Sequence, residues 1–162
     1  NTRGSCLDFE PTSGERTLFD FDADGEADLS LFRPSNAYWY IQKSTEGFNS
    51  FAFGLSTDKL APADFDGDGR TDHTVFRNGT WHIQRSNDGY IGVVFGTTGD
   101  VPAPEDFTGD GKADLAVFRP SAGVWQTLDL TNNQSNTVSF GLSSDEPVPA
   151  DYDGDGKADY AV

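Results

Sequence analysis

DFDGDGRTD, at residues 64–72, is one of four copies of an acidic phrase in this chain. The other copies are DFDADGEAD at 20–28, DFTGDGKAD at 106–114 and DYDGDGKAD at 151–159. Their first aspartates lie 44, 42 and 45 residues apart. A period of this length is typical of proteins in which each repeat forms one supersecondary unit and stacks on its neighbours. The phrase therefore predicts a repeat architecture.

The phrase also has the composition of a calcium loop. It places acidic side chains at positions 1, 3, 5 and 9 and glycine at position 6. Calcium takes six to eight oxygen ligands, and glycine permits the positive φ that a tightly curled loop needs. An EF-hand would close with glutamate at position 12 and continue as a helix. Here aspartate at position 9 precedes strand-like residues, so we predict a calcium loop within a β-hairpin.

The predicted ligands are the same positions in every loop. The side-chain ligands are Asp20, Asp22, Asp24 and Asp28; Asp64, Asp66, Asp68 and Asp72; Asp106, Thr108, Asp110 and Asp114; and Asp151, Asp153, Asp155 and Asp159. The backbone-carbonyl ligands are Glu26, Arg70, Lys112 and Lys157. Because Thr108 replaces an aspartate, we predict that the third site is the weakest. Solvated acidic turns are the alternative, but four matching copies favour metal binding over solvation or catalysis.

Charge and composition agree with this interpretation. The 162 residues carry a formal net charge of −16, and four Ca²⁺ ions would reduce it to about −8. This balance argues against nucleic acid and against anionic membranes as partners. No apolar run is long enough to span a bilayer, and no secretory leader is visible, so a secreted protein would have this sequence in its mature form. Calcium-filled weak sites predict an extracellular or cell-surface location.

A longer repeat surrounds the acidic phrase. Tryptophan recurs at positions 39, 81 and 125, and each unit ends in Phe-Gly, at 53–54, 95–96 and 140–141. Between them lie short runs rich in Val, Ile, Phe and Tyr, which favour strands, and Asn78-Gly79 is a strong hairpin signal. We count four strands per unit, with the acidic loop between the first and the second. Four strands every 42–45 residues predict an all-β chain of propeller-type blades.

The blades do not add up to a closed ring. We predict a single repeat domain over residues 1–162, with blades at 15–57, 58–99 and 100–144, a half blade at 145–162, and a strand within 1–14 that completes a preceding or neighbouring blade. Propellers have four to eight blades, and open edges invite further pairing. The chain is therefore expected to be a fragment, to close a ring with a second copy, or to join copies tail to head. The complementary leftover strands favour joining between copies.

The repeated motifs resemble a known family. The D-x-D-x-D-G-x-x-D loop, the Phe-Gly pair and the F-R-P-S turn are similar to the FG-GAP/VCBS-type repeats of integrin-α-like β-propellers, from about Leu18 to Val162. The resemblance implies a calcium-stabilised propeller with metal in the loop that joins strands one and two. It also implies adhesion, carbohydrate binding or scaffolding outside the cell. Some relatives are lyases or lipases, but their catalytic residues cannot be identified in this sequence.

Other recurring or isolated residues are candidate sites. We expect the three tryptophans to pack between blades, although sugar stacking is the alternative, with Tyr38 and Tyr40 beside the first of them. The recurring Arg33, Arg77 and Arg119 are expected to bond carbonyls or acidic loops of the neighbouring blade, with a grip on a ligand carboxylate as the alternative. The isolated His73 and His82 are expected to be packed or solvated, Asn78 and Asn133 match the N-glycosylation pattern, and Cys6 is expected to be buried, to bridge two chains or to be free.

The sequence therefore predicts a non-enzymatic, extracellular structural or adhesion module. No Ser-His-Asp, Cys-His or glycine-rich phosphate pattern is present, which argues against catalysis. The expected partners are other copies of the chain, possible glycans and cell-surface proteins. A lectin-like propeller and a piece of a larger secreted protein are the alternatives.

Overall fold

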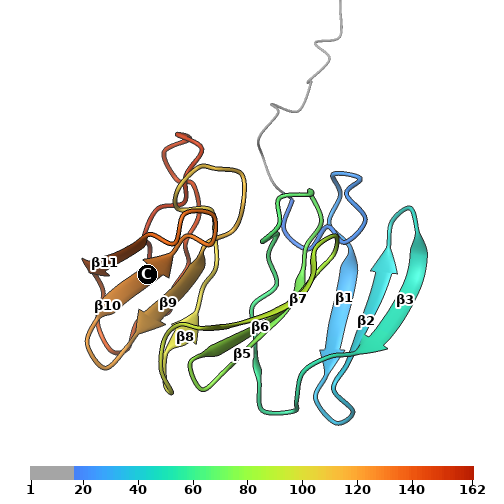
Figure 1. Ribbon diagram of the computed structural model, residues 1–162, viewed down its shortest axis with the longest axis horizontal. Coiled ribbons are helices and arrows are strands. Elements are labelled where there is room, and N and C mark those ends of the chain that lie inside the picture. The colour runs from blue at the N-terminus through green and yellow to red at the C-terminus, as the bar shows by residue number, and fades with distance from the viewer. Residues whose placement is uncertain (1–16) are drawn as a thin grey trace, which may run out of the picture.

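The computed structural model describes residues 17–162, and its regular elements in this range are all β-strands. They form three antiparallel sheets that stand side by side, with the acidic loops along one side of the row, at the top in Figure 1. No helix that could span a bilayer occurs between residues 17 and 162. The expectation of an all-β chain built from propeller-type blades is confirmed.

Each sheet is a meander in which consecutive strands pair. The first contains β1 (Leu29–Arg33), β2 (Tyr38–Lys43) and β3 (Gly47–Ala52). The second contains β4 (Lys59–Leu60), β5 (His73–Arg77), β6 (Thr80–Arg85) and β7 (Gly89–Val94). The third contains β8 (Val101–Pro102), β9 (Leu115–Arg119), β10 (Val124–Leu128) and β11 (Ser135–Ser139).

The tight turn between β5 and β6 follows from its sequence. Asn78 and Gly79 both have positive φ, 50° and 84°, as a two-residue hairpin of this kind requires. The turn sets the register in which Arg77 faces Thr80. A Cβ atom on Gly79 would lie 2.6 Å from the carbonyl oxygen of Gly96, so only glycine fits at this position.

Two parts of the predicted blade count differ from the structure. The first sheet has three strands in the described range, because residues 17–19 form no strand and only Phe19 keeps the closing hydrogen bond, from Asp28 N–H (2.8 Å). The expected half blade is reduced to the Ala150–Asp159 bridge and a bond from Val148 N–H to Ala161 O (2.9 Å). The strand predicted within 1–14, and Cys6 with it, lie outside the described residues.

The tryptophans hold the core of each blade, which confirms packing as their role. Trp39, Trp81 and Trp125 are all at most 2 % exposed. The indole N–H of Trp39 donates to Phe53 O (3.0 Å), and that of Trp81 donates to Phe95 O (2.9 Å). Each of these bonds ties the third strand of a blade to the Phe-Gly pair that ends it.

Neighbouring blades meet through the glycine of the Phe-Gly pair. A Cβ atom on Gly54 would lie 3.1 Å from Val75 of the next blade, and one on Gly96 would lie 3.2 Å from Val117. Both valines are fully buried. The absence of a side chain at these glycines therefore lets the second strand of the next blade approach closely.

Candidate metal centres in the acidic loops

The four acidic loops share one backbone conformation. The sixth residue of each loop has a φ of 86° or 87°, at Gly25, Gly69, Gly111 and Gly156. The fourth residue also has positive φ, at Ala23, Gly67, Gly109 and Gly154. Because L side chains rarely adopt this region, glycine stabilises the curl at these positions, and Ala23 is the exception among them. The expected role of the sixth-position glycine is thus visible in the backbone.

The first aspartate of each loop organises that curl. In the second loop, Asp64 Oδ1 accepts a hydrogen bond from Gly67 N–H (2.7 Å) and Oδ2 accepts one from Gly69 N–H (2.9 Å). Asp20, Asp106 and Asp151 accept the corresponding bonds in the other loops. The loop therefore closes around its first carboxylate, much as a backbone turn closes around a capping side chain.

In the first and second loops, the aspartate at position 3 joins the loop to the turn between the third and fourth strands of the same blade. Asp22 Oδ2 accepts N–H bonds from Thr45 (3.0 Å) and Glu46 (3.1 Å). Asp66 Oδ2 accepts them from Asn87 and Asp88 (3.1 Å each).

The other oxygen of both carboxylates, Asp22 Oδ1 and Asp66 Oδ1, is buried with no hydrogen-bond partner. A buried, unsatisfied carboxylate oxygen is costly, because burial removes the water that would solvate it. These two atoms are therefore the ones for which a cation would supply the missing interaction.

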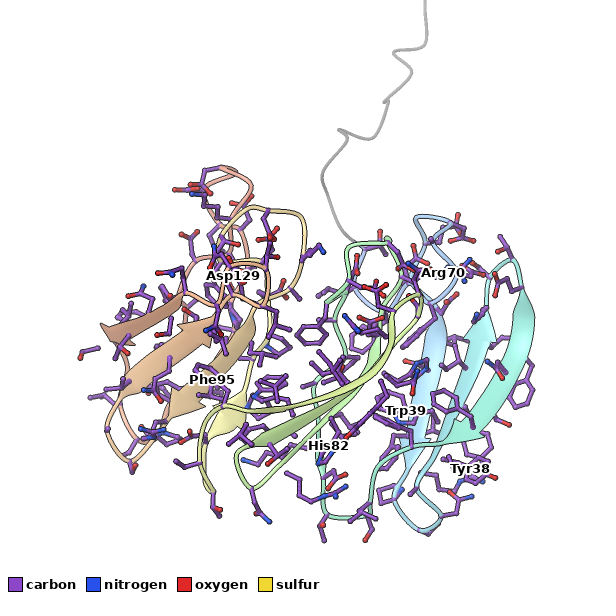
Figure 2. All side chains as sticks on the ribbon, in the orientation of Figure 1. Tyr38, Trp39, Arg70, His82, Phe95 and Asp129 are labelled. Atoms are coloured by element: carbon purple, nitrogen blue, oxygen red, sulfur yellow. The ribbon has the colours of Figure 1, made fainter. Side chains whose placement is uncertain are left out.

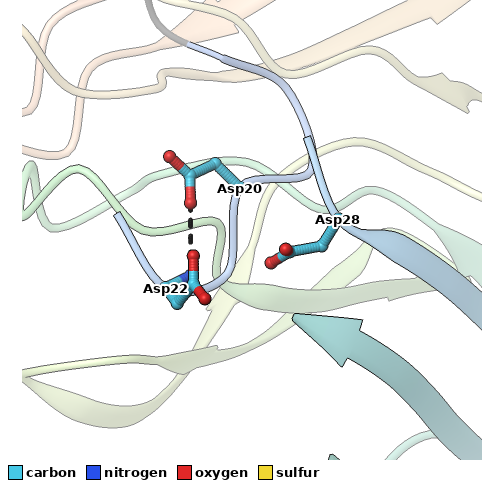
Figure 3. Close-up of side chains that lie close together, drawn as sticks. All are labelled: Asp20, Asp22 and Asp28. Atoms are coloured by element: carbon cyan, nitrogen blue, oxygen red, sulfur yellow. Dashed lines mark hydrogen bonds between the residues drawn. The ribbon is translucent and has the colours of Figure 1, made fainter. Parts of the chain in front are cut away.

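Three loops bring their carboxylates together. Oxygens lie within 4.8 Å of one another in the groups Asp20–Asp22–Asp28, Asp64–Asp66–Asp72 and Asp151–Asp153–Asp159. Figure 3 shows the first group, with the Asp22 N–H donating to Asp20 Oδ1 (3.2 Å). Within residues 17–162 the third loop forms no such group, as expected from Thr108. Exposed acidic groups can cluster without a metal, but the first group is buried.

The aspartates at position 5 of the loops bond other groups instead of joining the carboxylate groups. Asp68 accepts bonds from Arg70 N–H (2.9 Å) and from the Ser86 hydroxyl (2.6 Å), and Asp110 does the same with Lys112 N–H (3.0 Å) and Thr131 Oγ1 (2.8 Å). Asp24 bonds Glu26 N–H (2.8 Å) and the Ser44 hydroxyl, while Asp155 bonds Lys157 N–H (2.9 Å). These predicted ligands therefore stand outside the carboxylate groups in the described geometry.

Burial and mutual repulsion make the grouped charges unfavourable. Burial raises the pKa of Asp72 to about 7, and the charges of Asp66 and Asp64 raise it further. The N–H bonds from Ser86 and Phe65 act in the opposite direction and lower it. Burial likewise raises the pKa of Asp114 to about 6. A divalent cation would reverse this effect, because an opposite charge favours the ionised form.

Adjacent loops are joined by one recurring backbone bond. Thr71 N–H donates to Asp20 O (2.6 Å), Ala113 N–H to Asp64 O (2.7 Å) and Ala158 N–H to Asp106 O (2.8 Å). We call these three bonds the loop ladder. The sequence carries no signal for it, because any residue can make a backbone hydrogen bond.

Two of the three recurring arginines bond an aspartate at the start of their own predicted blade rather than the neighbouring blade. Arg77 pairs with Asp58 (2.6 Å) and Arg119 with Asp100 (2.8 Å), in each case in the connection from the preceding blade. Arg33 instead lies over the ring of Tyr40, 4.4 Å from its centre. The two aspartates were missed, although their recurrence six residues before a loop could have revealed them.

The histidines and the glycosylation candidates occupy ordinary positions. His73 is packed among aromatic rings, and His82 Nδ1 lies 2.9 Å from Tyr90 Oη. Asn78 and Asn133 lie in turns with positive φ. His73 is thus packed and His82 is half-exposed, and glycosylation stays a prediction.

A comparison with protein families identifies the repeat. The family model described as FG-GAP-like repeat matches residues 20–75 and 106–162, which is more than half of the chain. The protein belongs to the FG-GAP-like repeat family, as the resemblance predicted. Such repeats are found in adhesion and extracellular proteins and are typically structural rather than enzymatic. No curated protein and no solved structure matches this chain.

Proposed function

We propose that this protein is a non-enzymatic structural or adhesion module outside the cell, in which calcium bound by the acidic loops fixes the blades. The observation that supports it best is the pair of buried, unpartnered oxygens, Asp22 Oδ1 and Asp66 Oδ1, within groups of carboxylates. Calcium prefers such oxygen ligands. In the first and second loops the ion would join the loop to the adjacent turn, because Asp22 and Asp66 already accept that turn's N–H groups.

The residues proposed to hold calcium are the grouped first, third and ninth aspartates. Fifth-position aspartates and seventh-position carbonyls complete the proposed set, with a change in side-chain direction for the former. The proposed location follows from affinity, since extracellular calcium is concentrated enough to fill weak sites. Glycans and cell-surface proteins are the proposed partners besides other copies of the chain.

The proposal predicts that stability depends on calcium. A site at one hundred times its dissociation constant contributes about 2.7 kcal/mol, so three or four sites together would move the melting temperature by well over about 10 °C. Differential scanning calorimetry in calcium and in a chelator measures this shift. Asp66→Asn should reduce it, whereas Asp88→Asn, an equal charge change in the adjacent turn, should not. An identical melting temperature with and without chelator would overturn the proposal.

The same proposal includes self-association. Leu29 and Leu31 on β1 are 78 % and 54 % exposed, whereas Leu115 and Val117, their counterparts on β9, are fully buried by the preceding blade. The corresponding sheet face is buried in the later blades, so this exposed apolar face is suited to a protein contact. We propose that a second copy of the chain covers this face, and that a repeated contact of this kind builds a filament.

A further inference from the structure

The third repeat departs from the first two at two positions, and the changes are complementary. At position 3 of the loop, Thr108 stands where Asp22 and Asp66 stand in the first two units. At the end of the third strand, Asp129 stands where those units have Lys43 and Arg85, four residues after the tryptophan. The third unit thus lacks one carboxylate in its loop and carries another in place of a basic side chain.

Asp129 is positioned to act for the missing aspartate. It follows β10 directly, is 4 % exposed, and lies at the loop end of the third blade (Figure 2). Its Oδ1 accepts the N–H groups of Thr131 (2.6 Å) and Asn132 (3.4 Å) in the turn before β11. Asp22 and Asp66 use one oxygen for the corresponding turns of their own units.

The second oxygen extends the parallel in part. The side-chain hydrogen bonds of Asp129 to described residues use Oδ1, so Oδ2 accepts none of them. In the first two units the second oxygen of the position-3 aspartate is buried without a partner, whereas Asp129 Oδ2 keeps some exposure to solvent. In each of the three units one carboxylate therefore caps the turn and leaves its second oxygen available for another group.

That oxygen belongs to a residue that lines a small cavity. The cavity has a volume of about 130 Å³, and its walls include Thr108, Asp114 and Asp129. This space exceeds the roughly 30 Å³ that one water molecule occupies in the liquid, so it has room for an ion with waters. Asp114 senses the charge of Asp129, which adds to burial in raising the pKa of Asp114.

We propose that Asp129 is a ligand of a hard divalent cation in the third loop, where it takes the place of the third-position aspartate. The inference rests on the proposed function, because it assumes that the loops bind such ions. A water can complete the site, as water carries one ligand position of an EF-hand. With Asp129 the third site regains its fourth carboxylate, but among the described residues these carboxylates form no group of three within 4.8 Å, so binding requires their side chains to turn toward the ion.

The test follows each site separately in the whole 162-residue chain. Calcium is added to ¹⁵N-labelled protein, and the amide signals of the sixth-position glycines, Gly25, Gly69, Gly111 and Gly156, report their own loops. In Asp129→Asn the midpoint at Gly111 should rise at least about tenfold, because affinity follows the number of charged ligands. The other three glycines should keep their midpoints. Asn retains an oxygen for the Thr131 N–H, so the turn is preserved.

Two further variants separate ligation from a structural role. Thr108→Asp combined with Asp129→Asn recreates the arrangement of the first two loops and should restore the wild-type midpoint at Gly111. Asp88→Asn removes one charge from the second unit's turn and should leave Gly111 unchanged.

Four results are decisive. An unchanged Gly111 midpoint in Asp129→Asn overturns the inference, and so does a double variant that folds without regaining affinity. If Gly25, Gly69 and Gly156 respond and Gly111 does not respond even in the wild type, the third loop binds no cation and the inference fails alone. If no glycine responds, the proposed function fails with it.

Discussion

His73 shows how a single side chain can depart from the repeat without breaking it. Its ring packs against Phe51, Phe21 and Trp39, with ring centres 4.2, 4.9 and 5.3 Å away. The counterpart in the next blade is Leu115, which is fully buried. Unlike leucine, histidine brings a polar atom into this contact, and His73 Nε2 is buried without a partner.

We predict that His73→Leu stabilises the protein. Removing a buried, unpaired polar atom while keeping a side chain of similar volume should raise the free energy of unfolding by about 1–2 kcal/mol. Urea unfolding in saturating calcium measures this. His82→Leu is the control, because His82 has a partner in Tyr90 and should yield no gain. A loss of stability in His73→Leu would show that the ring contacts matter more than the unpaired nitrogen.

For individual residues, the sequence could predict shared positions in the repeat but not every spatial neighbour. The repeated spacing was enough to single out the loop aspartates and the packed tryptophans, because periodicity marks positions with a shared environment. It could not show that Asp129 lies beside the third loop. That proximity depends on the path of the β10–β11 turn, whose sequence has no counterpart in the other units.

At the scale of strands and loops, the connections between blades are held by an ion pair with the second strand of the following blade. Asp100 is 1 % exposed and accepts bonds from Arg119 Nε (2.9 Å) and Nη2 (2.8 Å), and from Thr97 N–H (2.9 Å). Burial by itself raises the pKa of Asp100, but the bonds from Arg119 and Thr97 outweigh it and lower the pKa overall. The pair therefore fixes the turn before β8 against β9.

We predict that Asp100→Asn destabilises the protein by about 2 kcal/mol at pH 7, because a buried charge-assisted pair is lost. A lowered pKa stabilises the folded state above the ordinary value of 3.8, and that stability is lost as the pH falls through the folded pKa. The difference between wild type and variant should therefore narrow below pH 3.8. Urea unfolding over a series of pH values measures it.

Asp88→Asn provides the comparison for this prediction. Its pair with Arg85 is long, at 3.4 Å, and the Asp88 side chain is 53 % exposed. Exposed pairs of this kind contribute little, so a loss below about 0.5 kcal/mol is expected. Equal losses in the two variants would contradict the role assigned to burial.

Element positions were more predictable than element lengths. Turn chemistry and alternating apolar residues located the second, third and fourth strands of each blade. The innermost strands are only two residues long, and in the first and last units they shrink to one or two backbone contacts. Their pairing depends on the preceding blade connection rather than on their own composition, so propensity could not set their length.

On the scale of the whole molecule, the face of β1 is where we propose that copies meet. At each internal joint a basic side chain at position 7 lies over the preceding loop. Lys112, for example, would have its Cγ 3.0 Å from a Cβ atom on Gly67. The first loop has Glu26 at this position, which would face an acidic loop if another copy docked there.

We predict that wild-type chains associate in calcium, that Leu31→Asp abolishes the association, and that Glu26→Lys strengthens it. The first change places a charge in the apolar contact, and the second replaces repulsion with attraction. Sedimentation velocity over a concentration series distinguishes these outcomes. A wild-type chain that stays a folded monomer throughout would instead favour coverage by another segment of a longer protein.

The loop ladder gives the row of blades a direction. Every internal joint has its donor on the later loop and its acceptor on the earlier one, so a pull along the row loads the same short backbone bonds in series. Ions seated in the loops would stiffen the parts that carry this load. A surface tether built from such units would resist shear flow in calcium-rich water and slacken where the ion is withdrawn.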